Sequence, residues 1–286
     1  MNHIPKFMRL ALLQLKVGKD KTTNVQNALA KIAEAFREYT PRLVILPECF
    51  NCPYGTKYFR DYSETVPDGY TSQHLSAAAK SYGIYIVGGT IPELGENDAI
   101  YNTCTVWDPK GNMISKYRKM HLFDIDIRNG QRFKESDTLT AGQNFSVIQI
   151  DDHKIGIGIC YDIRFEELAR VYRNEGCEML IYPGAFNMTT GPLHWELLQR
   201  SRANDNQLYV VTTSPARDKD AEYVAWGHSM VVDPWAKVLK SAGVGDEIIS
   251  VDIDFSLVKQ VREQIPTFRQ RRLDLYTTKP VNTCWN

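Results

Sequence analysis

The chain has 286 residues, 43% hydrophobic and 24% charged, and its 34 basic and 34 acidic residues leave no formal net charge. This is the composition of a globular protein without the basic surface that nucleic-acid binding requires. No apolar stretch approaches the ~20 residues of a membrane span. The first ten residues lack a signal-peptide core, and the pattern of the six cysteines indicates reduced thiols. We expect a cytoplasmic protein without nucleic-acid or membrane partners; a mitochondrial pool stays open.

Apolar runs alternate with helical patterns in the first half. The predicted strands there are residues 8–17, 41–48 and 84–90. The predicted helices are 24–39, with Thr23 or Asn24 as a cap, and 72–83, which ends at Gly83. Residues 101–119 are predicted as two strands around a turn at 109–112.

The second half repeats the alternation. It is predicted to contain hairpins at 145–160 and 228–243, helices at 164–176 and 192–206, and strands at 179–186, 207–213 and 247–254. The turn of the first hairpin is placed at 151–153. The pattern favours one α/β domain with two sheets packed together and helices outside.

Three apolar strands are predicted to end at ionisable residues, namely Glu48, Lys119 and Cys160. Ligands of α/β folds bind at the carboxyl ends of strands. A thiol at its ordinary pKa of ~8.5 is mostly protonated, so a neighbouring carboxylate can accept its proton during attack. The resulting oxyanion needs a cation or free backbone N–H groups, and Lys119 and the turn after Cys160 could supply them. Taken singly, each of the three could instead be a solvated or core residue.

Other arrangements compete with this site. Cys49 and Cys52 form a Cys-x-x-Cys pair that suits a redox centre or half a zinc site, but no second pair follows. Ser229 lies in "GHSMV", a near match to a hydrolase elbow that lacks the last glycine and a following histidine. Cys160 with His194 could form a peptidase-like dyad, although a packed or capping histidine is the simpler interpretation.

The motifs resemble those of the carbon–nitrogen hydrolase (nitrilase) superfamily over nearly the whole chain. Glu48 lies in "VILPECF", Lys119 in "YRKMHLFD", Cys160 in "GICYDIRFEELAR" and Glu135 in "RFKESDTLTAG". Blocks such as "FNCPYGT" and "TTGPLHWELLQRSRA" most resemble the omega-amidase branch. The chain departs from many relatives at residues 165–167, where they read Phe-Pro-Glu, and at residues 205–207, where they read Glu-Asn-Gln.

The resemblance implies a four-layer αββα sandwich, with two sheets face to face and outer helices, which forms a homodimer and uses no metal or cofactor. The single domain would span residues 1–286, with a core at about 7–262 and a C-terminal extension at 263–286. Glu48 would be the general base and Cys160 the nucleophile. Lys119 and the Tyr161 backbone N–H would stabilise the oxyanion, and Glu135 would orient Lys119 or water. Without the resemblance, Glu135 could equally be an exposed residue at a helix start.

The substrate implied by the resemblance is a short dicarboxylic monoamide such as 2-oxoglutaramate or 2-oxosuccinamate. Arg164 would hold its carboxylate in a two-pronged contact, unless Arg164 pairs with Glu166 or Glu167. Thr190 is the matching loop hydroxyl, and Tyr54 and Phe186 are expected pocket walls. Alternatives are a deaminated-glutathione amidase, another nitrilase-family amidase or carbamoylase, and a non-catalytic binding protein.

Overall fold

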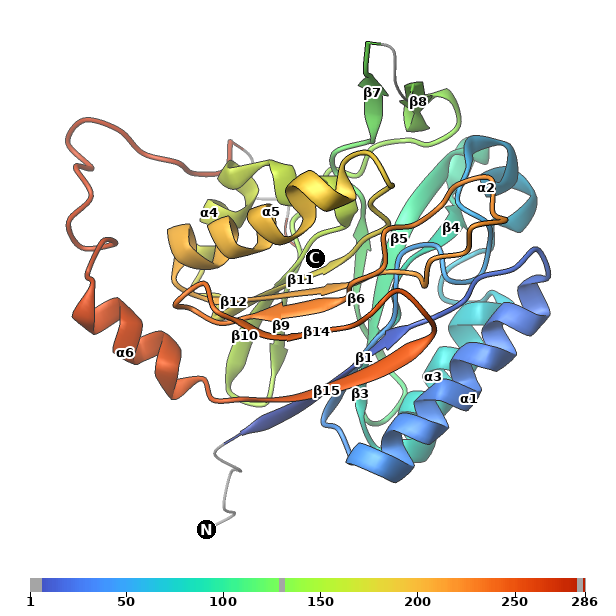
Figure 1. Cartoon of the computed structure of the whole chain (residues 1–286), viewed down its shortest axis with the longest axis horizontal. Coiled ribbons are helices and arrows are strands. Elements are labelled where there is room, and N and C mark those ends of the chain that lie inside the picture. Colours follow the sequence, from blue (N-terminus) through green and yellow to red (C-terminus); the bar gives the residue numbers. More distant parts are fainter. Residues whose placement is uncertain (1–6, 129–131, 282–284, 286) are drawn as a thin grey trace.

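Two mixed β-sheets lie face to face with helices on both outer sides (Figure 1). The computed structural model describes residues 7–128, 132–281 and 285. The first sheet has the order β15 (Glu247–Ile253), β1 (Met8–Gln14), β2 (Leu43–Ile45), β3 (Tyr85–Val87), β5 (Ile100–Trp107) and β4 (Ile91–Leu94). Strand β6 (Met113–Arg118) also pairs with β5. The parallel centre and antiparallel edges follow from the alternation seen in the sequence.

The second sheet is built from the middle and the end of the chain. Its order is β14 (Val238–Ser241), β13 (Met230–Val232), β12 (Tyr209–Thr213), β11 (Met179–Pro183), β10 (His153–Ile157) and β9 (Val147–Ile150). Strands β10, β11 and β12 are parallel. Their carboxyl ends therefore meet at one edge of the sheet, where ligands of such folds bind.

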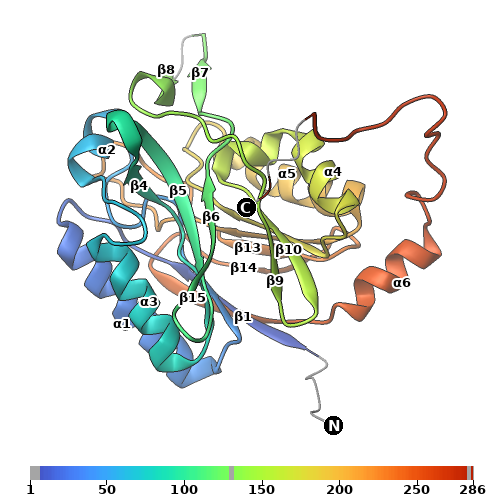
Figure 2. The same cartoon turned by 180° about the vertical axis from the view of Figure 1, so that it is seen from behind.

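Helices cover the outer faces. Helices α1 (Lys21–Tyr39) and α3 (Tyr70–Tyr82) lie against the first sheet. Helices α4 (Glu166–Asn174) and α5 (Gly191–Asn206) lie against the second, and Figure 2 shows the two helix pairs on opposite sides. The expected four-layer αββα class is therefore confirmed.

Strand β1 shows why the layers form. Leu10 and Leu12 belong to the hydrophobic core between the two sheets. Ala11 and Leu13 alternate with them and pack in a second core under α1 and α3. Because strand side chains point alternately to opposite faces, a fully apolar strand must be covered on both sides.

Gly156 sets the spacing between β10 and α4. A Cβ atom added there would lie 2.8 Å from Tyr172 Cγ on α4 and 2.7 Å from Leu180 Cδ2 on β11. Real Cβ atoms do not approach other atoms that closely. Only glycine lets the helix pack this near to the strand that leads to Cys160.

Several predicted boundaries were wrong. Asp20, not Thr23 or Asn24, caps α1, because its side chain accepts a hydrogen bond from the Thr23 N–H. Strand β2 ends at Ile45 and β10 at Ile157, so Glu48 and Cys160 lie in the segments beyond them. The helix predicted at 164–176 is α4, which begins at Glu166, and an unpredicted 3₁₀ helix, Cys160–Arg164, precedes it. Gly83 ends α3 as predicted, in the left-handed conformation.

Some elements were not predicted, namely α2 (Thr56–Tyr62), β4, the β7–β8 hairpin (Asp124–Asp126 and Arg132–Lys134) and α6 (Ser256–Gln264). The described cysteines, Cys49, Cys52, Cys104, Cys160 and Cys177, are buried free thiols. Cys284 and the first six residues lie outside the described residues. The predictions about reduced thiols, a leader segment and the span of the domain include these residues. No described helix is long and apolar enough to cross a membrane.

Candidate active site

Three ionisable side chains from different strands converge between the sheets. Lys119 follows β6 directly, Glu48 follows β2 by three residues, and Cys160 opens the 3₁₀ helix after β10. Glu48 and Lys119 are fully buried, and Cys160 is 5% exposed. A buried charge is costly unless it is paired, so such a cluster requires a matched set of partners.

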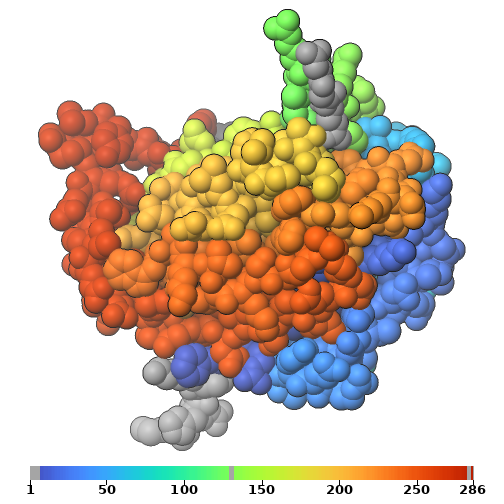
Figure 3. Space-filling model, in the orientation of Figure 1, coloured from blue at the N-terminus to red at the C-terminus, as the bar shows by residue number. Residues whose placement is uncertain are grey.

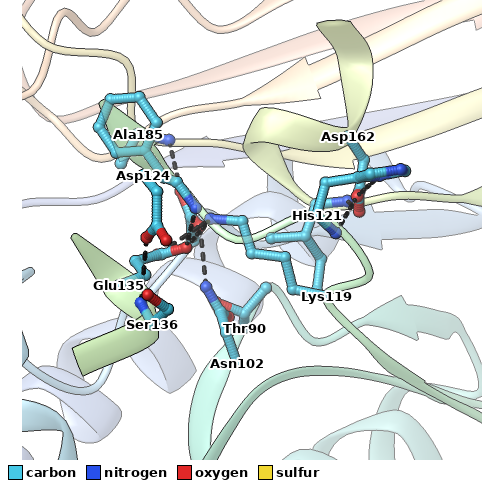
Figure 4. A network of polar contacts seen from close by, with 12 residues as sticks. Thr90, Asn102, Lys119, His121, Asp124, Glu135, Ser136, Asp162 and Ala185 are labelled. Atoms are coloured by element: carbon cyan, nitrogen blue, oxygen red, sulfur yellow. Dashed lines mark hydrogen bonds and ion pairs between the residues drawn. The ribbon is translucent and has the colours of Figure 1, made fainter. Parts of the chain in front are cut away.

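Lys119 lies between two carboxylates. Its Nζ is 3.1 Å from Glu48 Oε1 and 3.0 Å from Glu135 Oε1. Figure 4 shows the Lys119 side chain extending toward Glu135. The structure thus brings the two predicted acidic residues to the same ammonium group.

Backbone and amide donors hold Glu48 in place. Asn102 Nδ2 donates to Glu48 Oε1 at 2.9 Å, and the Ala185 N–H donates to Glu48 Oε2 at 2.8 Å. Asn102 lies on β5, and Ala185 follows β11. With Lys119, these contacts fix the orientation of the carboxylate before any substrate binds. Neither Asn102 nor Ala185 was anticipated from the sequence.

Glu135 is fully buried, so the exposed-residue interpretation is wrong. Its Oε1 accepts a hydrogen bond from the Tyr54 hydroxyl and its Oε2 one from the Phe123 N–H, both at 2.7 Å. Tyr54 therefore positions Glu135 in addition to lining the pocket. Through Glu135, these contacts determine where the charge of Lys119 lies.

Burial shifts the titration of all three groups. It raises the pKa of the Cys160 thiol well above its ordinary value, and the Glu48 charge raises it further. Burial also raises the pKa of Glu48, against the opposing effect of Lys119. For Lys119, burial acts to lower the pKa, but Glu135 and Glu48 together raise it well above the ordinary value. The site thus holds a neutral thiol beside a strengthened base and a permanent cation.

Cys160 has an unusual backbone conformation. Cys160 has a φ of 43°, in the left-handed region that residues other than glycine rarely adopt. A Cβ atom on the neighbouring Gly184 would lie 3.3 Å from Cys160 Cα. The chain therefore bends sharply at Cys160, directly before the 3₁₀ helix that carries Tyr161 and Arg164.

Asp162 holds this bend together. Its Oδ2 accepts hydrogen bonds from the Ile159 N–H and the Tyr117 hydroxyl, both at 2.8 Å. Its Oδ1 accepts one from the His121 N–H at 3.0 Å and contacts His121 Nδ1 at 2.7 Å. One buried carboxylate therefore ties the Cys160 bend to the segment after Lys119, as Figure 4 shows on the side away from Glu135. Sequence reasoning missed this role, and the only available signal was that Asp162 lies two residues after Cys160.

A cavity of about 190 Å³ opens beside Glu48. Tyr54, Tyr223 and Ala185 line it, together with residues of the 215–225 segment. Tyr223 packs at a tilt against Tyr54, with ring centroids 4.4 Å apart, and donates a hydrogen bond to the Ala185 carbonyl. The cavity is smaller than the roughly 300–1,000 Å³ of a drug-sized ligand pocket, so it would hold only a small molecule.

Arg164 does not pair with either of the expected glutamates. Glu166 binds Arg170, and Arg164 forms no salt bridge with any described residue. Its guanidinium lies 4.8 Å from the Phe186 ring centroid. Burial lowers the pKa of Arg164 from its ordinary value. A half-buried cation is thus left without an anionic partner from the described chain.

Thr190 and Phe186 both lie close to α5. Thr190 ends the segment before α5, and its hydroxyl donates to Asn187 Oδ1 at 3.0 Å. Phe186 is buried and packs edge-on against Trp195. Their contact with substrate stays a prediction, as does the oxyanion role of the Tyr161 N–H.

The structure also places the residues of the alternative sites, namely His194, Ser229 and the Cys49–Cys52 pair. His194 Nδ1 contacts Arg164, so the dyad with Cys160 is not formed. The Ser229 hydroxyl donates to Gln14 Oε1 and accepts from the Ser214 N–H, as a structural residue does. Cys49 and Cys52 are buried thiols at the cavity.

The two-sheet sandwich and the buried glutamate–lysine–cysteine cluster define a protein of the nitrilase type. The chain belongs to the carbon–nitrogen hydrolase family, whose model matches residues 9–263.

Similar proteins are known from several organisms. Omega-amidase NIT2 of Xenopus tropicalis is 54% identical over 271 residues, which is 95% of this chain and 97% of that protein. Omega-amidase NIT2 of Homo sapiens is 53% identical with the same coverage. The crystal structure of Saccharomyces cerevisiae Nit3, a member of branch 10 of the nitrilase superfamily, superposes with a TM-score of 0.86 at 46% identity and covers 93% of this chain and 97% of that one.

Proposed function

We propose that this chain is an omega-amidase that hydrolyses short dicarboxylic monoamides, such as 2-oxoglutaramate and 2-oxosuccinamate, to the dicarboxylate and ammonia. Two omega-amidases more than 50% identical over nearly the whole chain support the activity. The observation that carries the acidic substrate is Arg164, a half-buried cation without a carboxylate partner among the described residues. A substrate with a carboxylate at its far end would supply that partner.

The reaction begins with proton transfer from Cys160 to Glu48. The raised pKa of the thiol keeps it protonated at rest, and the raised pKa of Glu48 makes this carboxylate a better acceptor. As the proton leaves, sulfur attacks the amide carbon, a C–S bond forms, and the carbonyl oxygen becomes an oxyanion. The Lys119 charge and the Tyr161 N–H stabilise that oxyanion.

The tetrahedral intermediate collapses when Glu48 returns its proton to the amide nitrogen. The C–N bond breaks, ammonia leaves and a thioester to Cys160 stays. Glu48 then accepts a proton from a water molecule, which attacks the thioester carbon. The C–S bond breaks, the acid leaves, and Glu48 returns the proton to the Cys160 sulfur. Glu135 holds Lys119 in the same place through both steps, because Tyr54 and the Phe123 N–H fix its carboxylate.

At the far end of the substrate, Arg164 would hold the carboxylate in a two-pronged contact, while Phe186 packs against the guanidinium. Thr190 would add a hydroxyl. As placed, this hydroxyl donates to Asn187, so it must turn toward the substrate to donate there.

The test is ammonia release from 2-oxoglutaramate, deaminated glutathione, a neutral amide of similar length and a simple nitrile. We expect kcat/KM to be highest for 2-oxoglutaramate. Arg164→Ala should lower that value about 10- to 100-fold, as loss of a charged hydrogen-bond pair does, and leave the neutral amide nearly unchanged. Arg164→Lys should recover only part. Preference for deaminated glutathione or the nitrile would assign another branch of the family.

We also propose that two copies pair through α5. Leu193 and Leu197 lie four residues apart on one face of this helix and are 66% and 59% exposed. Trp235, 45% exposed, lies in the turn whose Ala236 carbonyl accepts from Arg200 of α5. Figure 3 shows α5, in yellow, and the segments next to it at the surface of this face. Adjacent exposed apolar side chains of this kind mark interaction surfaces.

For the chain as a whole, we propose one domain, with a core at residues 7–262 and an extension at 263–286. The core between the sheets includes both Met8 and Val258, and α6 ends at Gln264. Limited proteolysis should trim the extension and leave the core intact. We propose the cytoplasm as the compartment, supported by the free thiols of the described cysteines and testable by cell fractionation.

A further inference from the structure

Two hydrogen bonds link Arg164 to α5, the helix that covers the second sheet: Arg202 Nη2 donates to the Arg164 carbonyl, and the Arg164 guanidinium contacts His194. Arg164 Nη1 and His194 Nδ1 are 3.2 Å apart. Arg164 comes from the 3₁₀ helix that begins with Cys160, and His194 from the first turns of α5. The other neighbours of the Arg164 guanidinium are aromatic. The ring centroids of Phe186 and Tyr161 lie 4.8 and 5.7 Å from Arg164 Cζ. Rings attract the cation but leave the guanidinium free to slide over their faces.

This contact determines the protonation state of His194. A guanidinium has only donor groups, so Nδ1 must accept, and the ring is neutral with its proton on Nε2. Burial first, and then the charge of Arg164, lower the pKa of His194, which favours the same neutral form.

His194 is itself firmly placed. Its N–H donates to the Thr190 carbonyl at 2.9 Å, and the Thr190 N–H donates to Asn187 Oδ1 at 2.8 Å. The adjacent Trp195 is buried and donates from Nε1 to the His228 carbonyl. The backbone that carries the imidazole is therefore held in place at the start of α5, within reach of the Arg164 side chain.

We propose that neutral His194 is a positioning residue that orients Arg164 to bind the carboxylate of the substrate. This inference rests on the proposed function. One N–H of the guanidinium is used by His194, and the fork keeps further donors for a two-pronged contact. Held in this way, Arg164 loses less conformational freedom when the substrate binds, so His194 acts on substrate affinity and not on the chemical step.

The experiment compares KM and kcat in wild type, His194→Ala and His194→Asn. Asparagine can place an amide oxygen close to the position of Nδ1 and accept the same hydrogen bond. With 2-oxoglutaramate we expect His194→Ala to raise KM about tenfold and change kcat less than about twofold, in keeping with loss of one charge-assisted hydrogen bond. His194→Asn should recover most of the affinity. Neither variant should change KM for the neutral amide.

His74→Ala is the matched control. His74 lies on α3, on the opposite side of the sandwich, where its Nδ1 contacts the Tyr70 carbonyl. This variant should match wild type on both substrates.

The outcomes separate the two claims. A wild-type enzyme without preference for the acidic amide would refute the proposed function itself. If wild type shows the preference and His194→Ala keeps the wild-type KM, the positioning role is overturned. Equal losses on the acidic and neutral amides, or no recovery in a folded His194→Asn variant, would make His194 a packing residue of α5 and overturn it as well.

Discussion

Lys119 is the only ammonium group that the structure places between Glu48 and Glu135 within the described part of the chain. Two buried carboxylates and one cation leave an excess of negative charge beside Cys160. That excess keeps the thiol protonated until substrate arrives, because a thiolate would add a further negative charge. The Lys119 charge is then required when the carbonyl oxygen becomes negative.

Replacing Lys119 with methionine should remove this charge while keeping most of the stem. We expect kcat for 2-oxoglutaramate to fall at least about 10²–10³-fold, the usual effect of removing one oxyanion donor. Steady-state kinetics measure it. Near-normal kcat in a folded variant would show that Lys119 does not act on the oxyanion.

The pH dependence of substrate affinity follows from His194. Its pKa is lowered, so the imidazole is neutral above about pH 6.5, and the affinity that depends on Arg164 should be constant there. As the pH falls through the lowered pKa, Nδ1 gains a proton, stops accepting and repels Arg164. KM for the acidic amide should then rise, and KM for the neutral amide should not.

The charged groups around α5 are consistent with assigning this pH dependence of KM to His194. The 3₁₀ helix contributes Arg164, while Glu166 and Arg170 of α4 bind each other. Strands β12 and β13 contribute no charged side chain to their contacts with α5, where Glu196 and Arg200 also pair. A KM for the acidic amide that rises equally in wild type and in His194→Asn as the pH falls would contradict the role of His194.

The sequence predicted part of this site. Glu48, Lys119 and Cys160 stand at the ends of apolar strands and in family motifs, so both pattern and resemblance indicate them. Asn102 and Asp162 were missed because each acts through a hydrogen bond to a residue distant in the chain. Such pairings depend on how strands are ordered in a sheet, which periodicity does not specify.

At the scale of elements, four amphipathic helices and most of the apolar strands were predicted, and α2, α6, β4, β7 and β8 were not. Helix α2 has seven residues and buries only Phe59, so it has almost no apolar periodicity. The three-residue strands β7 and β8 expose most of their side chains. Their structure depends on contacts with the site, such as the Phe123 N–H to Glu135, more than on local pattern.

The packing of β10 against α4 gives a prediction at this scale. Gly156→Ala should lower the free energy of unfolding by about 1–3 kcal/mol, because the new methyl group would overlap Tyr172 and Leu180. Gly245→Ala is the control, since nothing lies within 4 Å of a Cβ atom there. Denaturant unfolding of both variants measures the difference. Equal stability would mean that the helix can move away from the strand without cost.

At the scale of the molecule, the exposed face of α5 is next to residues that we propose to bind substrate. Leu193 directly precedes His194 in the chain, and Thr190 comes just before α5. If a second copy covers this face, it also holds the first turn of α5 in place. Assembly would then support the site without giving it a catalytic residue.

Leu193→Asp combined with Leu197→Asp should convert the proposed dimer to monomer, because it places charge in an apolar contact. Sedimentation or light scattering measures the mass. Ile114→Asp, an equally drastic change at an exposed apolar residue of β6, should leave the mass unchanged. A wild-type protein that is already monomeric would refute the pairing.

The backbone of Cys160 has a consequence for how stable the protein can be. A φ of 43° at a residue with a Cβ atom costs about 1–2 kcal/mol, which glycine does not incur. Cys160→Gly should therefore be more stable to denaturant than Cys160→Ala, although glycine is normally the less stable of the two in regular structure. The chain thus gives up stability at the one position where it needs a thiol, and Asp162 holds the bend that relaxation would straighten. If Cys160 is the nucleophile, selection for stability alone would favour glycine at this position and an inactive enzyme.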